Sequence, residues 1–195
     1  MFTGIIEGMG RIKTLTRHEG NSTLVIECPF QDELKIDQSL AHNGVCLTVT
    51  GITDEGYTVT AVAETLRCTN LGELREGEIV NLERCMVMNG RIDGHIVQGH
   101  VDQTGTCTAI KEDEGSWLFT FNYDPAQGHV TVHKGSITVN GVSLTVAATA
   151  PGTFTVAIIP FTYEHTTFHT LKKGDTVNLE FDIIGKYVQA YMAGR

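Results

Sequence analysis

One stretch of eleven residues decides the fold, and it reads Ser39-Leu40-Ala41-His42-Asn43-Gly44-Val45-Cys46-Leu47-Thr48-Val49. A second copy begins 97 residues later and reads Ser136-Ile137-Thr138-Val139-Asn140-Gly141-Val142-Ser143-Leu144-Thr145-Val146. Seven of the eleven positions are identical. Asn-Gly between alternating apolar and polar residues is a strong hairpin signal, because the tight turn needs positive φ at both central residues. Each copy therefore predicts a β-hairpin.

The duplication extends beyond the hairpins. The same offset pairs Val80-Asn81-Leu82-Glu83 with Val177-Asn178-Leu179-Glu180, and an offset of 95 pairs residues 3–10 with residues 98–105. Two copies are too few for a solenoid, so we expect two tandem domains of one fold. We place them at residues 1–87 and 93–182, with Val87-Met88-Asn89-Gly90-Arg91 in the linker.

Each half is expected to be all-β. Short runs rich in Val, Ile, Thr and Phe alternate with Gly, Asn and Asp turns, at about six runs per half. A small closed barrel is the architecture that removes the exposed edges of such short strands. The sequence therefore predicts two tandem six-stranded barrels.

Alternation also predicts which side chains face outward on the second strand of each hairpin. Val142, Leu144 and Val146 point to one side, and Ser143 and Thr145 to the other. In the first half, Cys46 and Thr48 take the matching outward positions. An ordinary solvated sheet face explains one such pair, but the small polar pair recurs in both copies, which favours two related binding faces.

The tail differs from both halves. From residue 183 onward, apolar residues at 184, 187, 188, 191 and 192 follow helical spacing. A helix over residues 183–195 is marginal in isolation and needs a partner surface. Another copy of the same helix is the natural partner, so we expect a homo-oligomer.

Composition excludes several classes of protein. The chain has 195 residues, a net charge of −9 and a pI near 5.3, which argues against nucleic acid as partner. We expect no membrane span and no signal peptide, hence a cytoplasmic location. The five cysteines are odd in number and form no Cys-x-x-Cys pair, which predicts free, mostly buried thiols.

The motifs together resemble one known family. They are Met1-Phe2-Thr3-Gly4-Ile5, the two Asn-Gly-Val hairpins, Gly94-His95-Ile96-Val97-Gln98-Gly99-His100-Val101-Asp102, and Ile159-Pro160 followed by Thr162, Thr166 and Thr167. In this order on a duplicated chain, from residue 1 to about residue 190, they resemble the riboflavin synthases of the alpha-chain type, a family of lumazine-binding repeats.

The resemblance implies a fold and a reaction. Each half would be a Greek-key barrel that binds a lumazine or flavin ring, and the protein would be a homotrimer. A working site would lie between the N-terminal barrel of one subunit and the C-terminal barrel of its neighbour. There, two molecules of 6,7-dimethyl-8-ribityllumazine would give riboflavin and 5-amino-6-ribitylamino-pyrimidinedione by four-carbon transfer, with no metal or other cofactor. Lumazine synthase is a further candidate partner.

The resemblance also marks catalytic candidates, which are His100, Ser143, Cys46, Ser39 and Asp182. Imidazole can move a proton near neutral pH, although His100 could instead orient a loop. Cys46 and Ser143 could donate hydrogen bonds or act as nucleophiles, and their exchange of thiol for hydroxyl favours a binding role. Asp182 could accept a proton or only cap the tail helix.

Most of the expected substrate-binding residues fall into three groups, and the segment around His100 and Lys134 complete the set. The N-terminal residues could cover a ring, the two hairpin strands would bond to it, and two loop pieces would line the pockets. The full set is Phe2, Thr3, Gly4, Ile5, Ile6, Cys46, Leu47, Thr48, Thr60, Ala61, Val62, Ala63, Glu64, Thr65, Gly99, His100, Val101, Lys134, Ser143, Leu144, Thr145, Ile158, Ile159, Pro160, Phe161 and Thr162. The spacing of His95 and His100 is too weak a pattern to predict a metal site.

Three positions depart from the family pattern: Phe161, His165 and Asp93. They put in doubt only the affinity for the ribityl chain. A non-catalytic lumazine or flavin carrier is the alternative function, but a carrier would be expected to lose the polar set in one half. The flavin barrel of a reductase is a third hypothesis, and it would be followed by a Gly-rich nucleotide domain that is absent from this sequence.

Overall fold

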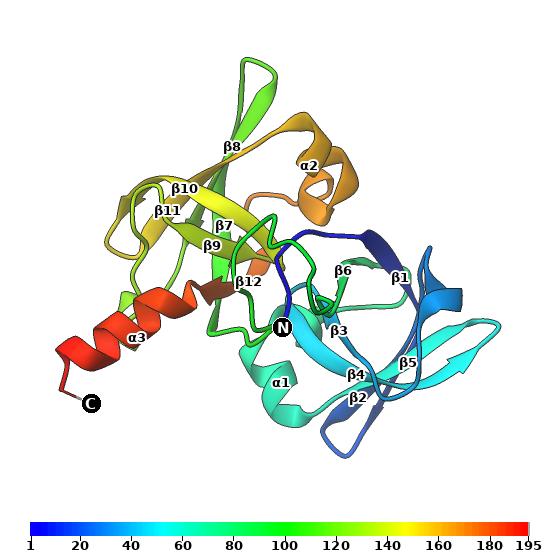
Figure 1. The fold of residues 1–195 in the computed structure, drawn as a ribbon. Helices are drawn as coiled ribbons and strands as arrows, with labels where there is room; N and C mark the ends of the chain where they lie inside the picture. Colours follow the sequence, from blue (N-terminus) through cyan, green and yellow to red (C-terminus); the bar gives the residue numbers. More distant parts are fainter. Residues whose placement is uncertain (195) are drawn as a thin grey trace.

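Six antiparallel strands close a barrel in the first half of the chain, as the computed structural model of residues 1–194 shows (Figure 1). The strands are β1 (Gly8–His18), β2 (Asn21–Glu27), β3 (Ser39–His42), β4 (Val45–Thr53), β5 (Gly56–Ala61) and β6 (Ile79–Arg84). Their order around the barrel is β1-β2-β5-β4-β3-β6, and β6 pairs with β1 to close it.

The second half repeats this barrel. Its strands are β7 (Gln103–Asp113), β8 (Ser116–Asn122), β9 (Ser136–Val139), β10 (Val142–Ala150), β11 (Thr153–Ile158) and β12 (Thr176–Phe181). The cyclic order β7-β8-β11-β10-β9-β12 matches the first barrel strand for strand. The prediction of two six-stranded barrels is therefore confirmed.

The two predicted hairpin turns meet where the barrels pack together. Asn43 and Gly44 have φ of 46° and 80°, and Asn140 and Gly141 have 47° and 79°. A Cβ on Gly44 would lie 2.8 Å from the backbone nitrogen of Gly141, and the reverse distance is 2.7 Å. Only glycine allows this approach, so the turns contribute to barrel packing as well as to hairpin geometry.

A buried asparagine network joins the halves around these turns. The Asn178 side chain donates to the Asn43 carbonyl at 2.9 Å, and the Asn81 side chain donates to the Asn140 carbonyl at 2.9 Å. Each asparagine also accepts a backbone N–H, from Asn70 and from Thr167 respectively. The repeated Val-Asn-Leu-Glu segments thus supply the polar bonds between the barrels.

Alternation on the hairpin strands is as predicted. Val45, Leu47 and Val49 lie inside the first barrel, and Val142, Leu144 and Val146 inside the second. Thr48 and Thr145 are exposed on the outer surface, and Cys46 and Ser143 are half-buried there.

Two short helices were not predicted. They are α1 (Ala63–Cys68) and α2 (Pro160–His165), each placed before the last strand of its barrel and followed by a 3-10 turn, at Asn70–Glu73 and Thr167–His169. A six-residue helix is too short to show 3.6-residue periodicity. Each is held by packing: Leu66 contacts the first core, and Tyr163 stacks on Trp117 with ring centroids 3.9 Å apart. Further 3-10 turns lie at Gln31–Glu33 and Pro125–Gln127.

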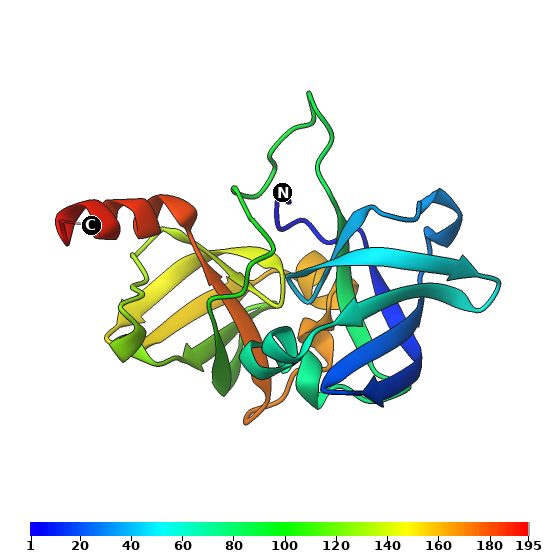
Figure 2. The ribbon, with the colours of Figure 1, turned by 90° about the horizontal axis from the view of Figure 1, so that it is seen from below.

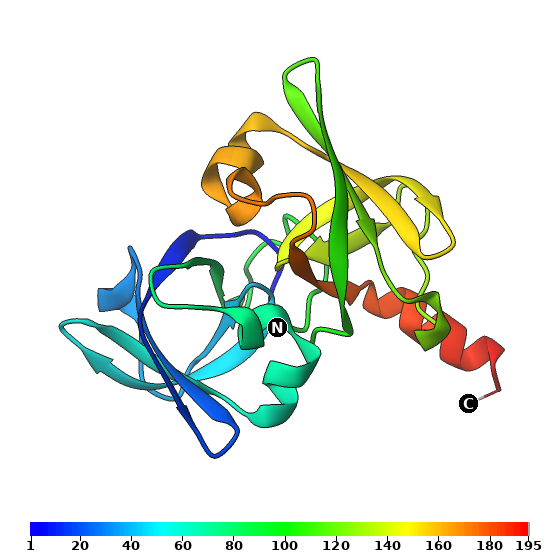
Figure 3. The ribbon, with the colours of Figure 1, turned by 180° about the vertical axis from the view of Figure 1, so that it is seen from behind.

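The predicted tail helix is present as α3 (Ile183–Met192), and Arg195 of the predicted 183–195 segment lies outside the described residues. It leads away from the first barrel and runs alongside the second, past its edge (Figures 2 and 3). Asp182 caps its start by accepting from the Ile184 backbone N–H at 2.9 Å. No helix in residues 1–194 is long and apolar enough to cross a membrane.

The segment between the barrels is longer than the predicted linker. Regular strand pairing ends at Arg84 and resumes at Gln103, and part of the intervening chain contacts the other half, as described below. The five cysteines are free, but only Cys107 is buried and Cys85 is exposed, so the prediction that most thiols are buried was wrong.

The first barrel holds a polar pair that the second lacks. His42 Nε2 lies 2.9 Å from the Tyr57 hydroxyl, and both side chains are buried. The matching residues of the second barrel are Val139 and Phe154. Burial lowers the pKa of His42 from about 6.5 to about 4, because the charged imidazolium loses its hydration.

We expect this pair to make folding sensitive to acid. Between the two pKa values the unfolded chain binds more protons than the folded one, so the free energy of unfolding falls as pH drops below about 6.5. His42 should account for up to about 3 kcal/mol of that loss near pH 4. The double variant His42→Val/Tyr57→Phe, which copies the second barrel, should lose less stability between about pH 7 and about pH 4.5 in urea titrations. Equal losses in both proteins would contradict this assignment.

Candidate functional site

The two outward polar faces lie on β4 and β10, the second strands of the matched hairpins. Cys46 and Thr48 form the first face, and Ser143 and Thr145 form the second. β3 and β9 fix these strands from one side, with Ser39 opposite Thr48 and Ser136 opposite Thr145. Each face therefore presents one half-buried thiol or hydroxyl and one exposed threonine.

Two short segments cross between the halves, and we call them the first arm (residues 2–6) and the second arm (residues 97–101). They start side by side: the Phe2 N–H donates to the Val97 carbonyl at 2.8 Å, and the Val97 N–H donates back at 3.1 Å. Phe2 is buried with Ala41 and Val97. It contributes to the seam between the halves, and its predicted contact with a ring stays a prediction.

Each arm docks on the face of the opposite barrel. The Gly4 carbonyl of the first arm accepts the Ser143 N–H at 2.8 Å, and the Gly99 carbonyl of the second arm accepts the Cys46 N–H at 2.9 Å. Ile6 packs against the second core and Val101 against the first. The exposed residues that follow these contacts are Ile5 and His100. Each face is thus completed by the other half of the chain.

The second face contains a histidine whose role the sequence did not reveal. His95 Nδ1 lies 2.7 Å from the Ser143 hydroxyl. Burial lowers the pKa of His95, and the charge of Asp182 opposes that shift. A neutral imidazole in this position can accept the hydroxyl proton of Ser143. In the sequence, the spacing to His100 gave only a weak metal pattern and did not connect His95 with Ser143.

The other catalytic candidates surround the two faces. His100 is exposed, and its backbone N–H donates to Glu180 at 3.0 Å. Asp182 is half-buried and caps α3, which is the structural role predicted for it as an alternative to proton transfer. Lys134, predicted only as a substrate contact, is exposed, and its backbone N–H donates to the Val146 carbonyl beside the second face.

The two pieces predicted as loops are strand ends and helix starts. Their exposed or half-buried members are Thr60, Val62, Ala63, Glu64, Thr65, Ile159, Pro160, Phe161 and Thr162. Ala61 and Ile158 lie inside the barrels, as do Leu47 and Leu144 of the hairpin strands. These four side chains belong to the barrel cores and support the strands from inside, so they are not part of the outer faces. Of the departures from the family pattern, Phe161 and His165 stack on each other on α2, and Asp93 is exposed in the interbarrel segment.

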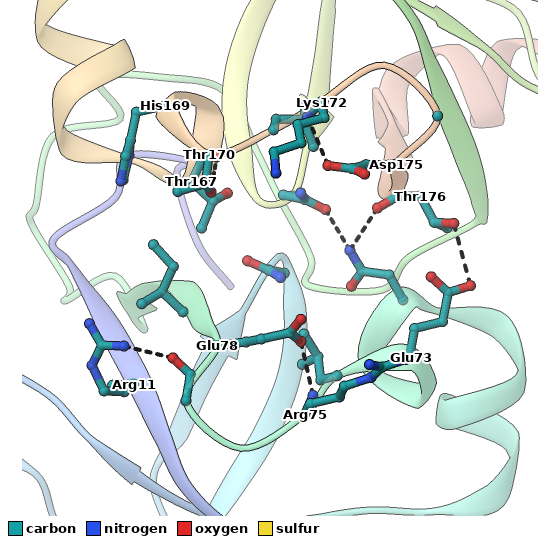
Figure 4. Close-up of a pocket in the computed structure, with 18 residues that line it drawn as sticks. Arg11, Glu73, Arg75, Glu78, Thr167, His169, Thr170, Lys172, Asp175 and Thr176 are labelled. Carbon is teal, nitrogen blue, oxygen red and sulfur yellow. Dashed lines mark hydrogen bonds between the residues drawn. The ribbon is translucent and has the colours of Figure 1, made fainter.

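A separate cleft of about 810 Å³ opens between the barrels and is lined by charged residues (Figure 4). Arg11, Arg75 and Lys172 lie there together with Glu73, Glu78 and Asp175. None of the predicted site residues lines it. The candidate site is therefore the pair of outer faces and not this cleft.

Comparisons with known proteins agree with the duplicated architecture. The lumazine binding domain family matches residues 3–85 and again residues 98–182. A riboflavin synthase of Bacillus subtilis is 42% identical over 193 residues, covering 98% of this chain and 90% of the relative. A riboflavin synthase of Mycobacterium bovis is 42% identical over 197 residues and covers 98% of both chains. That of Schizosaccharomyces pombe is 38% identical over 192 residues, with coverage of 97% and 92%.

Solved structures share the fold. LumP complexed with 6,7-dimethyl-8-(1'-D-ribityl) lumazine has a TM-score of 0.84 at 23% identity, and LumP complexed with riboflavin has 0.86 at 24%. Both alignments cover 93% of this chain and 99% of the other.

Proposed function

The chain belongs to the riboflavin synthase family, a family of enzymes with two lumazine-binding repeats, and from that premise we propose how its geometry performs the reaction. Two molecules of 6,7-dimethyl-8-ribityllumazine bind, one on each kind of face. A four-carbon unit passes from the donor to the acceptor, giving riboflavin, and the donor leaves as 5-amino-6-ribitylamino-pyrimidinedione. The observation that carries the proposal is the matched pair of polar faces, each completed by the opposite arm.

Positioning supplies much of the catalysis in this proposal. Two like heterocycles must meet face to face in opposed orientation, and two similar faces related by the duplication can hold them so. Fixing both partners can lower the barrier by about 7 kcal/mol or more. Thr48 and Thr145 would hydrogen-bond to the ring edges, since their hydroxyls both donate and accept.

Acid–base help would come from side chains on both faces. The reaction begins with loss of a proton from the ring methyl at carbon 7, while a nucleophile adds to the second ring and activates it. His95, bonded to the Ser143 hydroxyl, can take up a proton at the second face. His100 extends from the second arm beside Cys46 and can serve the first face. Water, Cys46 and Ser143 are the alternative nucleophiles.

The working site would form between subunits, with the N-terminal barrel of one chain facing the C-terminal barrel of its neighbour in a homotrimer. The exposed apolar side of α3 supports self-association: Ile184, Tyr187, Val188, Tyr191 and Met192 are each more than half exposed. An apolar helix face of this kind needs a partner, and a second copy supplies one of matching chemistry. Lumazine synthase remains a further proposed partner.

Riboflavin formation from purified protein and 6,7-dimethyl-8-ribityllumazine, followed by absorbance, tests the proposal directly. We expect turnover without added cofactor. Tight ligand binding without product would instead favour the carrier function. The recurrence of Cys46/Thr48 as Ser143/Thr145 supports the enzyme, because a carrier with one ligand per chain needs only one such face.

Replacing His100 by alanine should leave ligand binding to the first face intact and slow turnover by about 100-fold, the typical contribution of one acid–base group. The backbone N–H that anchors His100 is unaffected by this change, so the arm should stay in place. His18→Ala, at an exposed position on β1, is the matched control. Unchanged steady-state kinetics would remove His100 from the catalytic set.

Deleting residues 184–195 should give monomers with little activity, because the inter-subunit site loses its assembly helix. The deletion also removes the ion pair of Lys186 with Asp102, whose atoms are 2.6 Å apart. Tyr187→Glu/Tyr191→Glu keeps that pair while charging the apolar face, and it should give monomers too. Light scattering and turnover provide the measurement, and a truncated chain that stays trimeric would refute the role of α3.

A further inference from the structure

Two buried glutamates occupy matched positions on the last strands of the barrels. Glu83 on β6 is 5% exposed and Glu180 on β12 is 2% exposed. Neither forms an ion pair with a Lys or Arg among the described residues, although the charge of Lys186 acts on Glu180 and lowers its pKa against the effect of burial. A buried carboxylate without a cation is costly unless N–H or O–H groups satisfy it. The donors that satisfy these two carboxylates therefore indicate what the glutamates do.

Glu83 holds the first arm. Its Oε1 accepts the Thr3 N–H at 2.6 Å and the Thr3 hydroxyl at 2.8 Å, and its Oε2 accepts the Gly4 N–H at 2.9 Å. Hydrogen bonds to an ionised acceptor are about twice as strong as neutral ones. The carboxylate thus holds Gly4 in place, and the Gly4 carbonyl accepts the Ser143 N–H on the opposite barrel.

Glu180 holds the second arm in the same way. Its Oε1 accepts the Gln98 N–H at 2.7 Å, and its Oε2 accepts the N–H groups of Gly99 and His100 at 2.9 and 3.0 Å. The Gly99 carbonyl then accepts from the Cys46 N–H. Val101, two residues further on, packs against the core of the first barrel, and the exposed His100 lies between these two anchors.

We propose that Glu83 and Glu180 are positioning residues with crossed effects: the glutamate of each barrel sets the site on the other barrel. Glu180, in the second half, controls the Cys46 face, and Glu83, in the first half, controls the Ser143 face. The inference builds on the proposed function, since those faces are its binding sites.

Glutamine substitution tests the crossing without changing side-chain size. It replaces one acceptor oxygen by an NH₂ group that faces backbone N–H donors, so the arm loses a charged bond and gains a donor–donor repulsion. Losing one charge-assisted bond corresponds to about a tenfold to hundredfold change in an equilibrium. Glu112→Gln, at an exposed position on β7, is the matched control.

The measurement is amide hydrogen exchange of Cys46 and Ser143 by NMR in the full chain, first without ligand and then during riboflavin titration. Glu180→Gln should speed exchange of the Cys46 amide by about tenfold or more, leave Ser143 unchanged, and weaken riboflavin binding detected at Cys46. Glu83→Gln should do the reverse. Glu112→Gln should move neither amide.

Equal responses of both amides to either variant, or no response, would overturn the crossed assignment. If neither glutamine variant folds, Thr3→Val is the deciding variant. It removes the two bonds of the Thr3 hydroxyl, one to Glu83 and one from the Ile5 N–H, and keeps the backbone bonds to Glu83, so it should speed exchange at Ser143 alone. The ligand-free data test the positioning by themselves. If the wild-type chain fails to bind riboflavin, that result counts against the proposed function but not against the positioning of the arms by the two glutamates.

Discussion

Replacing Asn178 by alanine is expected to lower the free energy of unfolding by about 2–5 kcal/mol, one of the largest effects of any single polar substitution in this chain. The side chain donates to the Asn43 carbonyl and accepts the Asn70 N–H at 2.7 Å, and all three residues are buried. Truncation leaves both backbone groups without a partner, and each orphaned group costs about 1–3 kcal/mol. Chemical unfolding followed by the fluorescence of Trp117, the single tryptophan, measures the change.

Asn81→Ala should cost about as much, because it removes the equivalent bonds to Asn140 and Thr167. Asn122→Ala is the matched control, since Asn122 is an exposed strand residue on β8, and it should change stability by less than about 0.5 kcal/mol. An Asn178→Ala protein as stable as the Asn122→Ala protein would show that water replaces the lost partners and that the network contributes little.

Most of the fold could be predicted from the sequence because matched segments recur in the same order in both halves, at offsets of 97 and 95 residues. Many of the identical residues are those that a barrel and its packing require: apolar positions inside, glycines at the touching turns, and Asn81 and Asn178 between the halves. In the sequence, the repeated Val-Asn-Leu-Glu segment serves only to align the two halves. An asparagine and a glutamate that recur in a strand of each half are nevertheless a signal that the segment has polar partners outside its own strand.

The crossing of the arms could not be predicted. Residues 3–6 and 98–101 carry no hairpin or periodicity signal, and their positions depend on bonds to Glu83 and Glu180 some 80 residues away. The contact between His95 and Ser143 could not be predicted either, because the two residues lie 48 positions apart in the sequence and meet only when the chain folds. The resemblance named the arm residues as ligand contacts, but only the structure shows which barrel each arm serves.

Replacing Gly99 by alanine is expected to reduce turnover by about 100-fold or more while the barrels remain folded. A Cβ at this position would lie 2.7 Å from the Phe2 ring and 2.8 Å from the Cys46 Cβ, and φ is +78°. The second arm must therefore move off β4, and it takes His100 with it. Because a displacement of about 1 Å can cost about 100-fold in rate, the shift should appear in turnover before it appears in stability.

Gly4→Ala is the corresponding change at the other face, where the Cβ would lie 2.6 Å from the Ser143 Cβ at φ of +77°. Gly128→Ala separates contact from backbone strain, because Gly128 has φ of +82° but nothing within 4 Å of its Cβ position. It should cost about 1 kcal/mol of stability and leave riboflavin formation unchanged. If turnover by the Gly99→Ala protein is no slower than turnover by the Gly128→Ala protein, the close contact between the second arm and β4 is not needed for the reaction. A slow Gly99→Ala enzyme with a normal Gly128→Ala control would show that the close contact of the second arm with β4 sets the Cys46 face for the reaction.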